Sequence, residues 1–509
     1  MMKKILSLIF GALLLVPTAM WIIDPDFGIP ASRIGLDPPR MYPRALLDSQ
    51  YYKAFDQYYN DSFSLRSPLV FAKRRLDLHV FRMTDDPDVH VGREGWLFDR
   101  RSIEGLSNEA CPSKAYAERI ALNLYALEKI LEASGRRFFF MVAPSKSAIY
   151  PEFVGCVPSC NVPNRGRYDL ISDAISDLPV NNFVRLDLLL SEAKSSHELL
   201  YDKAGAYWNE LGAMVAAGAI QKKLVEDPRE KVVLKYKTTA TSVPDDLTRQ
   251  ILGFKTPNGD KPLRYFAGTG RPGQPFGIVY GDGFMQKLLP YLQQMFNRLD
   301  VIVDDDLPSR AHGEDWRRYD VIFLEKAESE LDLLDVDIGS ILSMFENEVR
   351  IFSKHPFDLK AAEAVSDISL GQGISGLEIK AVGNSSVFEL KSLPVSDENI
   401  FRLLKLSIEA PHADTMTIRY MTAHPYNTPK YLKKGITEVY LPLPLQRLES
   451  IQIQPGKQHG IFFLRSAEIL EFSNHHKPEE QHSNWLIYTD TELEEELTPL
   501  ISKKESVSV

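Results

Sequence analysis

The sequence predicts an α/β fold with a largely parallel sheet, followed by a C-terminal β-sandwich. Between residues 115 and 325, buried-strand patterns alternate with helical patterns, which is typical of parallel strands connected by helices. After about Asp358, short runs of alternating apolar residues are separated by Pro, Gly and Asn, which is typical of a sandwich of antiparallel strands. Ligands of open α/β sheets bind at the carboxyl ends of the strands, so a functional site is expected there.

The length and charge of the chain indicate several domains and exclude one class of partner. A chain of 509 residues is too long for one ordinary core. We expect a signal anchor over residues 1–24, an α/β domain over 40–355, a β-sandwich over 360–472 and an acidic tail over 473–509. The formal net charge of -10 argues against a nucleic-acid partner, because such proteins normally carry a basic surface.

The N-terminal residues predict a membrane segment. Lys3 and Lys4 precede an apolar run over residues 5–23, which is about the length that crosses a bilayer. Either a signal peptide or a signal anchor has this pattern, and a buried core helix is a third alternative. Because no small residues stand at the usual cleavage spacing, we expect an uncleaved anchor with the rest of the chain exported.

The individual elements follow from local patterns. Helices are expected over residues 115–134, 210–225 and 284–297, and strands over 137–143, 183–186, 276–280 and 320–325. The sandwich strands are expected over residues 387–390, 403–409, 416–421, 437–441, 450–453 and 461–464. Residues 42–82 have a helical pattern with interleaved aromatic and basic residues. Four of its basic residues could face glycan or lipid, or simply line a solvated helix face: Lys73, Arg74, Arg75 and Arg82.

The three cysteines fit an oxidising compartment without proving one. One disulfide could form among Cys111, Cys156 and Cys160, and one thiol would remain. The pairing stays open. A zinc site is less favoured, because no histidine lies at a familiar ligand spacing, and we expect no bound metal and no cofactor.

Four segments, in this order, carry a family signature: VGREGWLF over residues 91–98, PSK with IYP over 144–151, YDKAGAYWN with a following Gly-Ala over 201–213, and YGDGF over 280–284. Together they resemble the AlgX/AlgJ family of alginate O-acetyltransferases. This resemblance implies an SGNH-hydrolase-like fold for the α/β domain and a link to acetylation of surface polysaccharide. An unrelated α/β fold is the alternative.

The resemblance also implies which positions should carry the catalytic side chains. In this sequence none of the three positions carries the expected residue. In the family, a serine attacks the acetyl donor, a histidine takes its proton and an aspartate orients the histidine. The Asp and His positions are occupied here by Gly205 and Tyr207, and the Ser position by Gly283. Glycine has no nucleophilic atom, and a tyrosine with a pKa of about 10 is a poor proton acceptor.

Other polar and aromatic residues near these positions are candidates for binding. The expected pocket would be lined by Lys146, Tyr150, Trp208, Asn209 and Asp282. Alternatively, the Gly-Asp-Gly turn only shapes the backbone, with Asp282 capping the next helix. Displaced catalysis is a further alternative, and its candidates are Ser145, Ser147, Tyr207, Tyr280 and Asp282.

The sandwich carries a weaker signal for sugar binding. Residues 454–464 loosely resemble the ends of sandwiches attached to polysaccharide-synthesis proteins. Tyr420, Tyr426 and Tyr431, with His424, could stack on sugar rings, because aromatic faces offer flat apolar contact. The alternative is that these aromatic side chains pack in the core or at its rim.

These patterns predict a non-catalytic accessory protein of surface-polysaccharide (alginate-like) O-acetylation or export. It would bind glycan or an active partner at the periplasmic face of a bacterial inner membrane, or in the periplasm if the anchor is cleaved. An acetyltransferase or acetylesterase with displaced catalytic residues is the first alternative. A membrane-tethered protein-interaction module is the second.

Overall fold

The computed structural model describes residues 10, 38–42, 48–62, 66–104, 113–155, 167–195, 199–224, 246–252, 263–303, 315–333, 338–349, 351–373, 376–391, 400–422, 425–445 and 448–473. The predicted anchor over residues 1–24 therefore lies outside the described residues, apart from Phe10. The three cysteines, His424 and the tail after Ser473 lie outside them as well. None of the helices that the structure describes is both long and apolar enough to cross a membrane.

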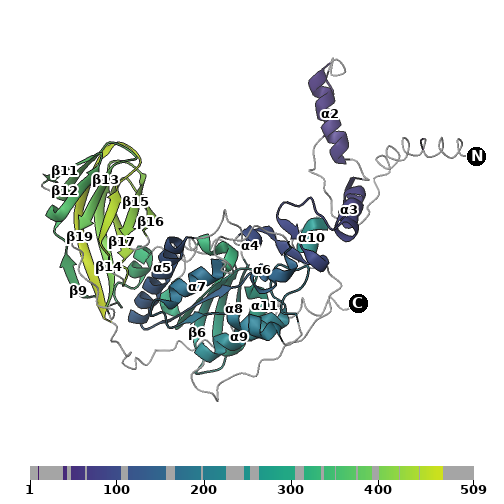
Figure 1. The fold of residues 1–509 in the computed structure, drawn as a ribbon, viewed down its shortest axis with the longest axis horizontal. Coiled ribbons are helices and arrows are strands. Elements are labelled where there is room, and N and C mark those ends of the chain that lie inside the picture. Colours follow the sequence, from purple (N-terminus) through teal and green to yellow (C-terminus); the bar gives the residue numbers. More distant parts are fainter. Residues whose placement is uncertain are drawn as a thin grey trace, which may run out of the picture. The chain divides into compact units, whose positions relative to one another are not determined.

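A six-stranded sheet forms the centre of the α/β part, in the order β4-β3-β8-β6-β7-β5 (Figure 1). Its strands are β3 (Arg137–Ala143), β4 (Phe183–Val184), β5 (Leu263–Ala267), β6 (Phe276–Gly281), β7 (Arg298–Val303) and β8 (Val321–Ala327). All neighbouring pairs are parallel except β5 with β7. The predicted largely parallel sheet is confirmed, although the sequence patterns missed β5 and β7.

Helices cover both faces of this sheet (Figure 1). Both faces must be covered because successive apolar residues of the strand β3 point into two different cores. Phe138, Phe140 and Val142 join one cluster with α5 (Lys114–Ala133) and α7 (Arg167–Ser176). Phe139 and Met141 join another with α8 (Asp187–Lys194), α9 (Glu210–Leu224) and α11 (Met285–Leu292). A continuous apolar strand is thus buried on both sides.

Short elements complete the α/β part. They include the helices α4 (Arg100–Glu104), α6 (Lys146–Ile149), α10 (Asp246–Leu252) and α13 (Ile338–Met344). Its 3-10 helices are η3 (Arg93–Gly95), η4 (Pro151–Phe153), η6 (Gln293–Met295), η7 (Trp316–Arg318) and η8 (Glu328–Leu333). Before them the chain forms α2 (Ser49–Ser62), α3 (Arg66–Leu76), the π-helix η2 (Asp77–Phe81) and a hairpin of β1 (Val89–Val91) and β2 (Leu97–Asp99).

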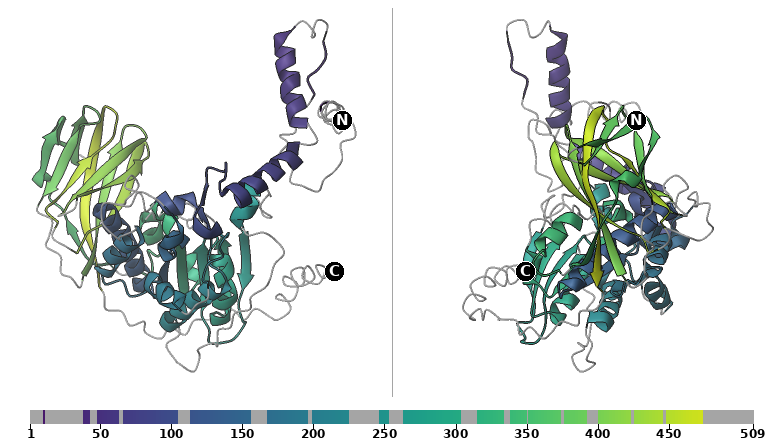
Figure 2. Two further views of the ribbon diagram at one scale, coloured as in Figure 1. Left: turned by 45° about the vertical axis from the view of Figure 1, so that its right-hand side comes forward. Right: turned by 90° about the vertical axis from the view of Figure 1, so that its left-hand side faces the viewer.

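The C-terminal part is a β-sandwich of two antiparallel sheets, visible from two sides in Figure 2. One sheet has the order β10-β13-β18-β15-β16, with strands Ala362–Ser366, Val387–Lys391, Ser450–Gln454, Asp414–Met421 and Tyr426–Leu432. The other has the order β11-β12-β19-β14-β17, with strands Ile368–Gly373, Gly376–Ala381, Gly460–Ser473, Ile400–Ala410 and Gly435–Pro442. The short helix η9 (Leu359–Ala361) precedes β10.

The strand β9 (Ile351–Pro356) corrects the expected start of the sandwich. The prediction placed residues up to 355 in the α/β domain, but β9 pairs with β19 from Phe472 to Glu468. Backbone pairing therefore assigns this strand to the sandwich, and the short segment 351–356 gave no alternation signal strong enough to reveal it.

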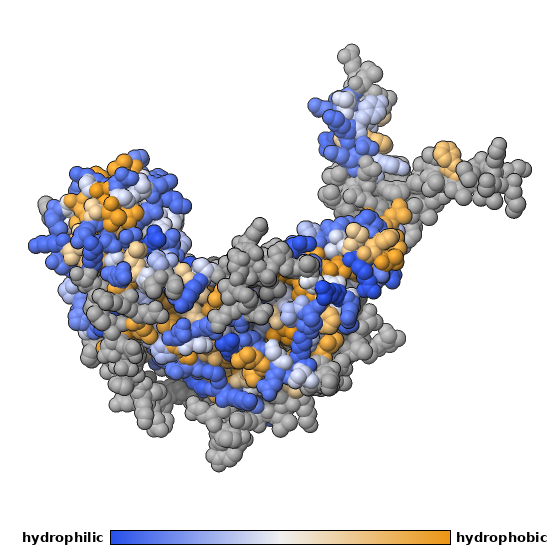
Figure 3. All heavy atoms as spheres, in the orientation of Figure 1, coloured by the Kyte–Doolittle hydropathy of each residue, from blue (hydrophilic) through white to orange (hydrophobic). Residues whose placement is uncertain are grey.

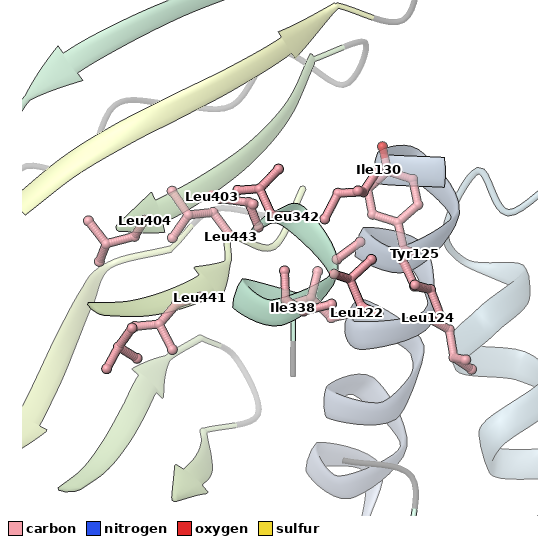
Figure 4. Close-up of a cluster of buried hydrophobic side chains, with 14 of the residues drawn as sticks. Leu122, Leu124, Tyr125, Ile130, Ile338, Leu342, Leu403, Leu404, Leu441 and Leu443 are labelled. Carbon is pink, nitrogen blue, oxygen red and sulfur yellow. The ribbon is translucent and has the colours of Figure 1, made fainter. Parts of the chain in front are cut away.

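One apolar cluster includes residues of both parts. Figure 4 shows Leu122, Tyr125 and Ile130 of α5 and Ile338 and Leu342 of α13 beside four sandwich leucines: Leu403, Leu404, Leu441 and Leu443. The ring of Tyr125 also meets the ring of Phe401 edge-on, with centroids 5.5 Å apart. Since these side chains are buried together, the α/β part and the sandwich stabilise each other through this cluster.

We predict that Leu403→Ala lowers the free energy of unfolding by about 2–5 kcal/mol, because it removes a fully buried side chain from the shared cluster. Denaturant unfolding of the full chain in mild detergent measures this loss. The control Leu188→Ala removes a leucine whose side chain is exposed, and should change stability by about 0.5 kcal/mol or less. Equal effects of the two substitutions would contradict the shared core.

Candidate functional site

The turn after β6 lies at the carboxyl end of the parallel sheet, where the site was predicted. Asp282 of this turn is only 2% exposed. Its Oδ1 accepts the N–H of Phe284 at 2.9 Å, and its Oδ2 accepts the N–H of Ala327, just at the end of β8, at 2.7 Å. Asp282 therefore ties two strand ends together, and the prediction that it lines a pocket is wrong because its carboxylate is buried.

Asp282 also forms part of a buried pair of carboxyl groups. Its own N–H donates to Oε2 of Glu325 at 3.0 Å, and Glu325 is fully buried. A Cβ at Gly281 would lie 2.6 Å from that same oxygen, so only glycine fits there. Burial raises the pKa of both carboxyls, and the nearby Asp282 raises that of Glu325 further. Glu325 was not predicted, because nothing near it in the sequence marks it as a partner of Asp282.

Lys146 was predicted to line the pocket, but it lies beneath the loop of residues 202–205. Its side chain is 2% exposed, and Nζ lies 5.6 Å from the ring centroid of Trp96 and 5.1 Å from that of Phe98. Nζ donates to the carbonyl oxygens of Asp202 and Lys203, both at 3.1 Å, and to that of Gly205. An ammonium group with three such acceptors positions the loop and is shielded from any ligand.

The other three predicted pocket residues also make contacts within the protein. The hydroxyl of Tyr150 accepts the N–H of Leu200 at 3.0 Å, and the indole N–H of Trp208 donates to the carbonyl of Phe284 at 2.9 Å. Both side chains are buried. Oδ1 of Asn209 accepts the N–H groups of Leu211 and Gly212, so this residue caps the N-terminus of α9. These contacts show that the three residues build the scaffold around the turn, and pocket lining by Asn209, which is half-buried, stays a prediction.

The positions that the resemblance assigned to histidine and serine are in contact. A Cβ built on Gly283 would lie 2.1 Å from Cζ of Tyr207 and 2.4 Å from its hydroxyl oxygen. The tyrosine ring also meets the ring of Phe284 edge-on at 5.0 Å, and the residue is 37% exposed. The ring of Tyr207 thus fills the space that any side chain at position 283 would need.

A carboxylate from elsewhere in the chain lies beside the position assigned to aspartate. A Cβ at Gly205 would lie 3.3 Å from Oδ1 of Asp246 and 3.3 Å from Cβ of Asp202. Asp246 accepts the N–H of Ala206, with distances of 2.9 and 3.2 Å to its two oxygens. Asp246 is exposed, but desolvation of its carboxyl by the surrounding residues raises its pKa. Asp246 was missed because it is distant in sequence and begins a seven-residue helix that no pattern predicted.

The candidates for displaced catalysis are mostly buried and hydrogen-bonded. The Ser147 hydroxyl donates to the carbonyl of Ser102 at 2.8 Å, and the Tyr280 hydroxyl accepts the indole N–H of Trp316 at 2.8 Å. Ser145 is buried, and its N–H donates to Glu328 at 3.0 Å. Among the described residues, no group of three or more His, Cys, Asp or Glu side chains could hold a metal ion.

The three tyrosines predicted to stack on sugar rings fall into two environments. Tyr420 and Tyr426 are buried, with their rings stacked at 4.7 Å, so for these two the prediction is wrong and core packing is correct. Tyr431 is 65% exposed and remains a candidate. Their alternation along the strands explains the difference, because residues of one strand face opposite sides of the sheet.

A row of polar side chains crosses the outer face of the same sheet. Arg419 of β15 lies opposite Asn427 of β16 and Gln452 of β18, and Gln452 lies opposite Glu389 of β13. Glu389 accepts hydrogen bonds from Ser450 at 2.5 Å and from Gln452 at 3.3 Å. Strand register brings these residues together, and register could not be predicted from the sequence alone.

Comparison with known proteins agrees with the fold predicted for the α/β part. Residues 89–259 match the family described as SGNH hydrolase-like domain, acetyltransferase AlgX. A probable alginate O-acetylase AlgJ of Pseudomonas syringae pv. tomato is 25% identical over 202 residues, covering 38% of this chain and 49% of that protein. The corresponding protein of Pseudomonas fluorescens is 23% identical over 186 residues, covering 36% and 44%. The chain thus spans about half the length of the curated relatives that it matches.

Two solved structures are also similar. The O-acetyltransferase domain of Pseudomonas putida AlgJ has a TM-score of 0.33 and 16% identity, covering 52% of this chain and 100% of that chain. AlgX of Pseudomonas aeruginosa has a TM-score of 0.33 and 12% identity, covering 76% and 94%. As the four sequence segments predicted, residues 89–259 match an SGNH hydrolase-like domain, and this part of the chain is AlgX/AlgJ-like.

Proposed function

We propose that this protein is a non-catalytic accessory of the O-acetylation of an alginate-like surface polysaccharide. One observation carries the proposal: the ring of Tyr207 occupies the space of a side chain at position 283, where the resemblance assigns the nucleophile. A residue that attacks an acyl donor must present its oxygen to an open pocket. Here that volume is filled from within the protein.

The electrostatic surroundings of Gly205 support the same conclusion. In an active triad, one carboxylate accepts the imidazole N–H and stabilises the positive charge that develops on the ring. Asp246 does not take over this role, because its two oxygens accept the backbone N–H of Ala206 and position 207 holds a phenol. The phenol has neither the basicity nor the second ring nitrogen that this proton relay needs.

The expected location follows from the N-terminal sequence and from the activity that the names of the relatives give. The two AlgJ proteins are named as probable alginate O-acetylases. We propose that this chain is anchored by residues 1–24 and exported to the periplasmic face of the inner membrane. There it would act beside the polysaccharide or beside proteins that acetylate and export it.

The sandwich offers a surface for the polysaccharide. Arg419 is exposed on the outer sheet face, in the middle of the row formed with Asn427, Gln452 and Glu389. A guanidinium can bind a uronate carboxylate through two parallel hydrogen bonds, and amide side chains can bind sugar hydroxyls. Tyr431 lies near one end of this face and can contact a sugar ring.

The enzyme alternative retains one specific candidate. Ser147 and Tyr280 are buried and hydrogen-bonded, but Tyr207 is partly exposed and its hydroxyl lies 2.4 Å from the position of a Cβ at residue 283. Turnover that depends on Tyr207 would therefore favour a displaced active site. The third alternative, a protein-interaction module, predicts neither turnover nor glycan binding.

We predict that Gly283→Ala destabilises the natural protein by about 1–3 kcal/mol, because the new methyl group must displace the ring of Tyr207. In a Tyr207→Ala background the same substitution should cost less, with a coupling energy of about 0.5–3 kcal/mol in a double-mutant cycle. The control is Gly218→Ala in α9, where a Cβ meets nothing within 4 Å and no coupling to Tyr207 is expected. Equal costs of Gly283→Ala in both backgrounds would show that the ring does not fill this space.

We predict no acetyl-ester turnover by the natural full chain above that of a buffer control. Combining Gly205→Asp, Tyr207→His and Gly283→Ser should raise turnover by orders of magnitude, because all three catalytic groups return together. Since the new carboxylate would meet Asp246 and Asp202, adding Asp246→Asn should increase the gain further. Turnover by the natural protein that disappears in the Tyr207→Phe variant would contradict the proposal that the protein is non-catalytic.

We predict that the natural chain binds alginate oligosaccharides and that Arg419→Ala weakens this binding by about tenfold, the loss of a charge-assisted hydrogen bond worth about 1.5 kcal/mol. Titration calorimetry measures the change. Lys380→Ala removes the same charge from β12, on the other sheet, and serves as the matched control. Equal affinities of the two variants, or no binding by the natural chain, would argue against this face.

A further inference from the structure

The helix formed by α3 and η2 has one side fixed to the α/β part. Leu78 of η2 is buried in a small apolar cluster with Val89 and Leu97 of the hairpin and with Leu247 and Ile251 of α10. The helix is therefore held in one orientation on that domain, and whatever its opposite side contacts will orient the domain as well.

The opposite side is apolar and exposed. Five exposed apolar side chains, between 50% and 62% exposed, lie along α3, η2 and the residues just after them: Leu69, Leu76, Val80, Phe81 and Met83. We call this set the outer face of α3. The first three are spaced by seven and four residues, which places them along one stripe of a helix. Figure 3 shows apolar side chains gathered over α3. A monomeric protein rarely exposes such a row without a partner.

The sequence of this segment is basic. Residues 66–83 contain five basic residues and one acidic residue, a formal charge of +4, whereas the whole chain carries -10; the acidic residues Asp85, Asp86 and Asp88 follow this segment. Lys73 contacts Asp77 at 2.6 Å and Asp85 at 3.4 Å, and Arg75 lies over the ring of Phe71. Apolar side chains among basic ones match the boundary between lipid tails and anionic headgroups.

The preceding helix α2 has a composition that fits the same boundary. Tyr51, Phe55 and Tyr59 stack along one side of it, with centroids 6.4 and 6.5 Å apart. Tyrosine is enriched where proteins cross the membrane–water interface, because its ring is apolar and its hydroxyl is wet. In the sequence, α2 also follows the apolar run of residues 5–23 within a short stretch of chain.

We propose that the outer face of α3 lies on an anionic bilayer surface and fixes the orientation of the α/β part there. This inference rests on the membrane location proposed above. A second copy of the chain is a poorer occupant, because a symmetric contact through this face would bring two positively charged segments together. Anionic lipid headgroups instead complement the charge, and the lipid acyl region accepts the apolar stripe.

The test reconstitutes the full chain into vesicles of phosphatidylethanolamine and phosphatidylglycerol and measures amide hydrogen exchange across residues 69–83. Exchange should be several-fold slower than in detergent, and the protection should weaken in vesicles of phosphatidylcholine alone. Combining Leu76→Glu and Val80→Glu should abolish the protection, because it places carboxylates against the headgroups. Val365→Glu, at an exposed valine of the sandwich, is the control and should leave it unchanged.

Two results would overturn the inference. Vesicle-bound protein that exchanges over residues 69–83 as fast as in detergent would show that the anchor holds but this face is free. Protection that instead rises with protein concentration in detergent would identify a second copy as the occupant. Neither result depends on acetyl turnover or glycan binding, so failure of this inference is distinguishable from failure of the accessory function.

Discussion

The ammonium group of Lys146, buried beneath residues 202–205, donates hydrogen bonds to three backbone carbonyls of that loop. An unpaired charge in such a position would be strongly unfavourable, so the loop must stay where its carbonyls solvate the ammonium group. After Ala206 the chain continues with Tyr207 and Trp208, and the indole of Trp208 donates to the carbonyl of Phe284. The placement of the candidate site therefore depends on this one buried cation.

At the contact between Tyr207 and Gly283, a large side chain lies beside a residue that has none. The ring of Tyr207 occupies the volume that a side chain at position 283 would need, and Gly283 leaves that volume free. A pair of one large and one small residue can maintain the packing density that protein interiors require, and neither Tyr207 nor Gly283 supplies the histidine or serine that the resemblance assigns. The proposed accessory function is consistent with this packing, because a domain that serves through its shape needs a filled interior and no open nucleophile position.

The sequence predicted the parallel sheet and most sandwich strands because continuous and alternating apolar runs are strong local signals. It failed where position depends on contacts distant in the chain. Asp246 reaches Ala206 only through the tertiary fold, and the strand β9 is recognised only by its pairing with β19. The pocket prediction failed for a different reason: Lys146 and Asp282 are polar, and sequence cannot distinguish a polar side chain that binds a ligand from one that holds backbone.

The buried carboxyls of Asp282 and Glu325 are an example of polar side chains that hold the backbone. Burying two acidic groups together is costly unless one of them holds a proton, and burial raises the pKa of both. Asp282 offsets this cost by accepting two backbone N–H groups that would otherwise be unsatisfied at the strand ends. An acidic residue at position 282 thus needs no catalytic reason, because its carboxylate holds the backbone of the turn and the end of β8 together.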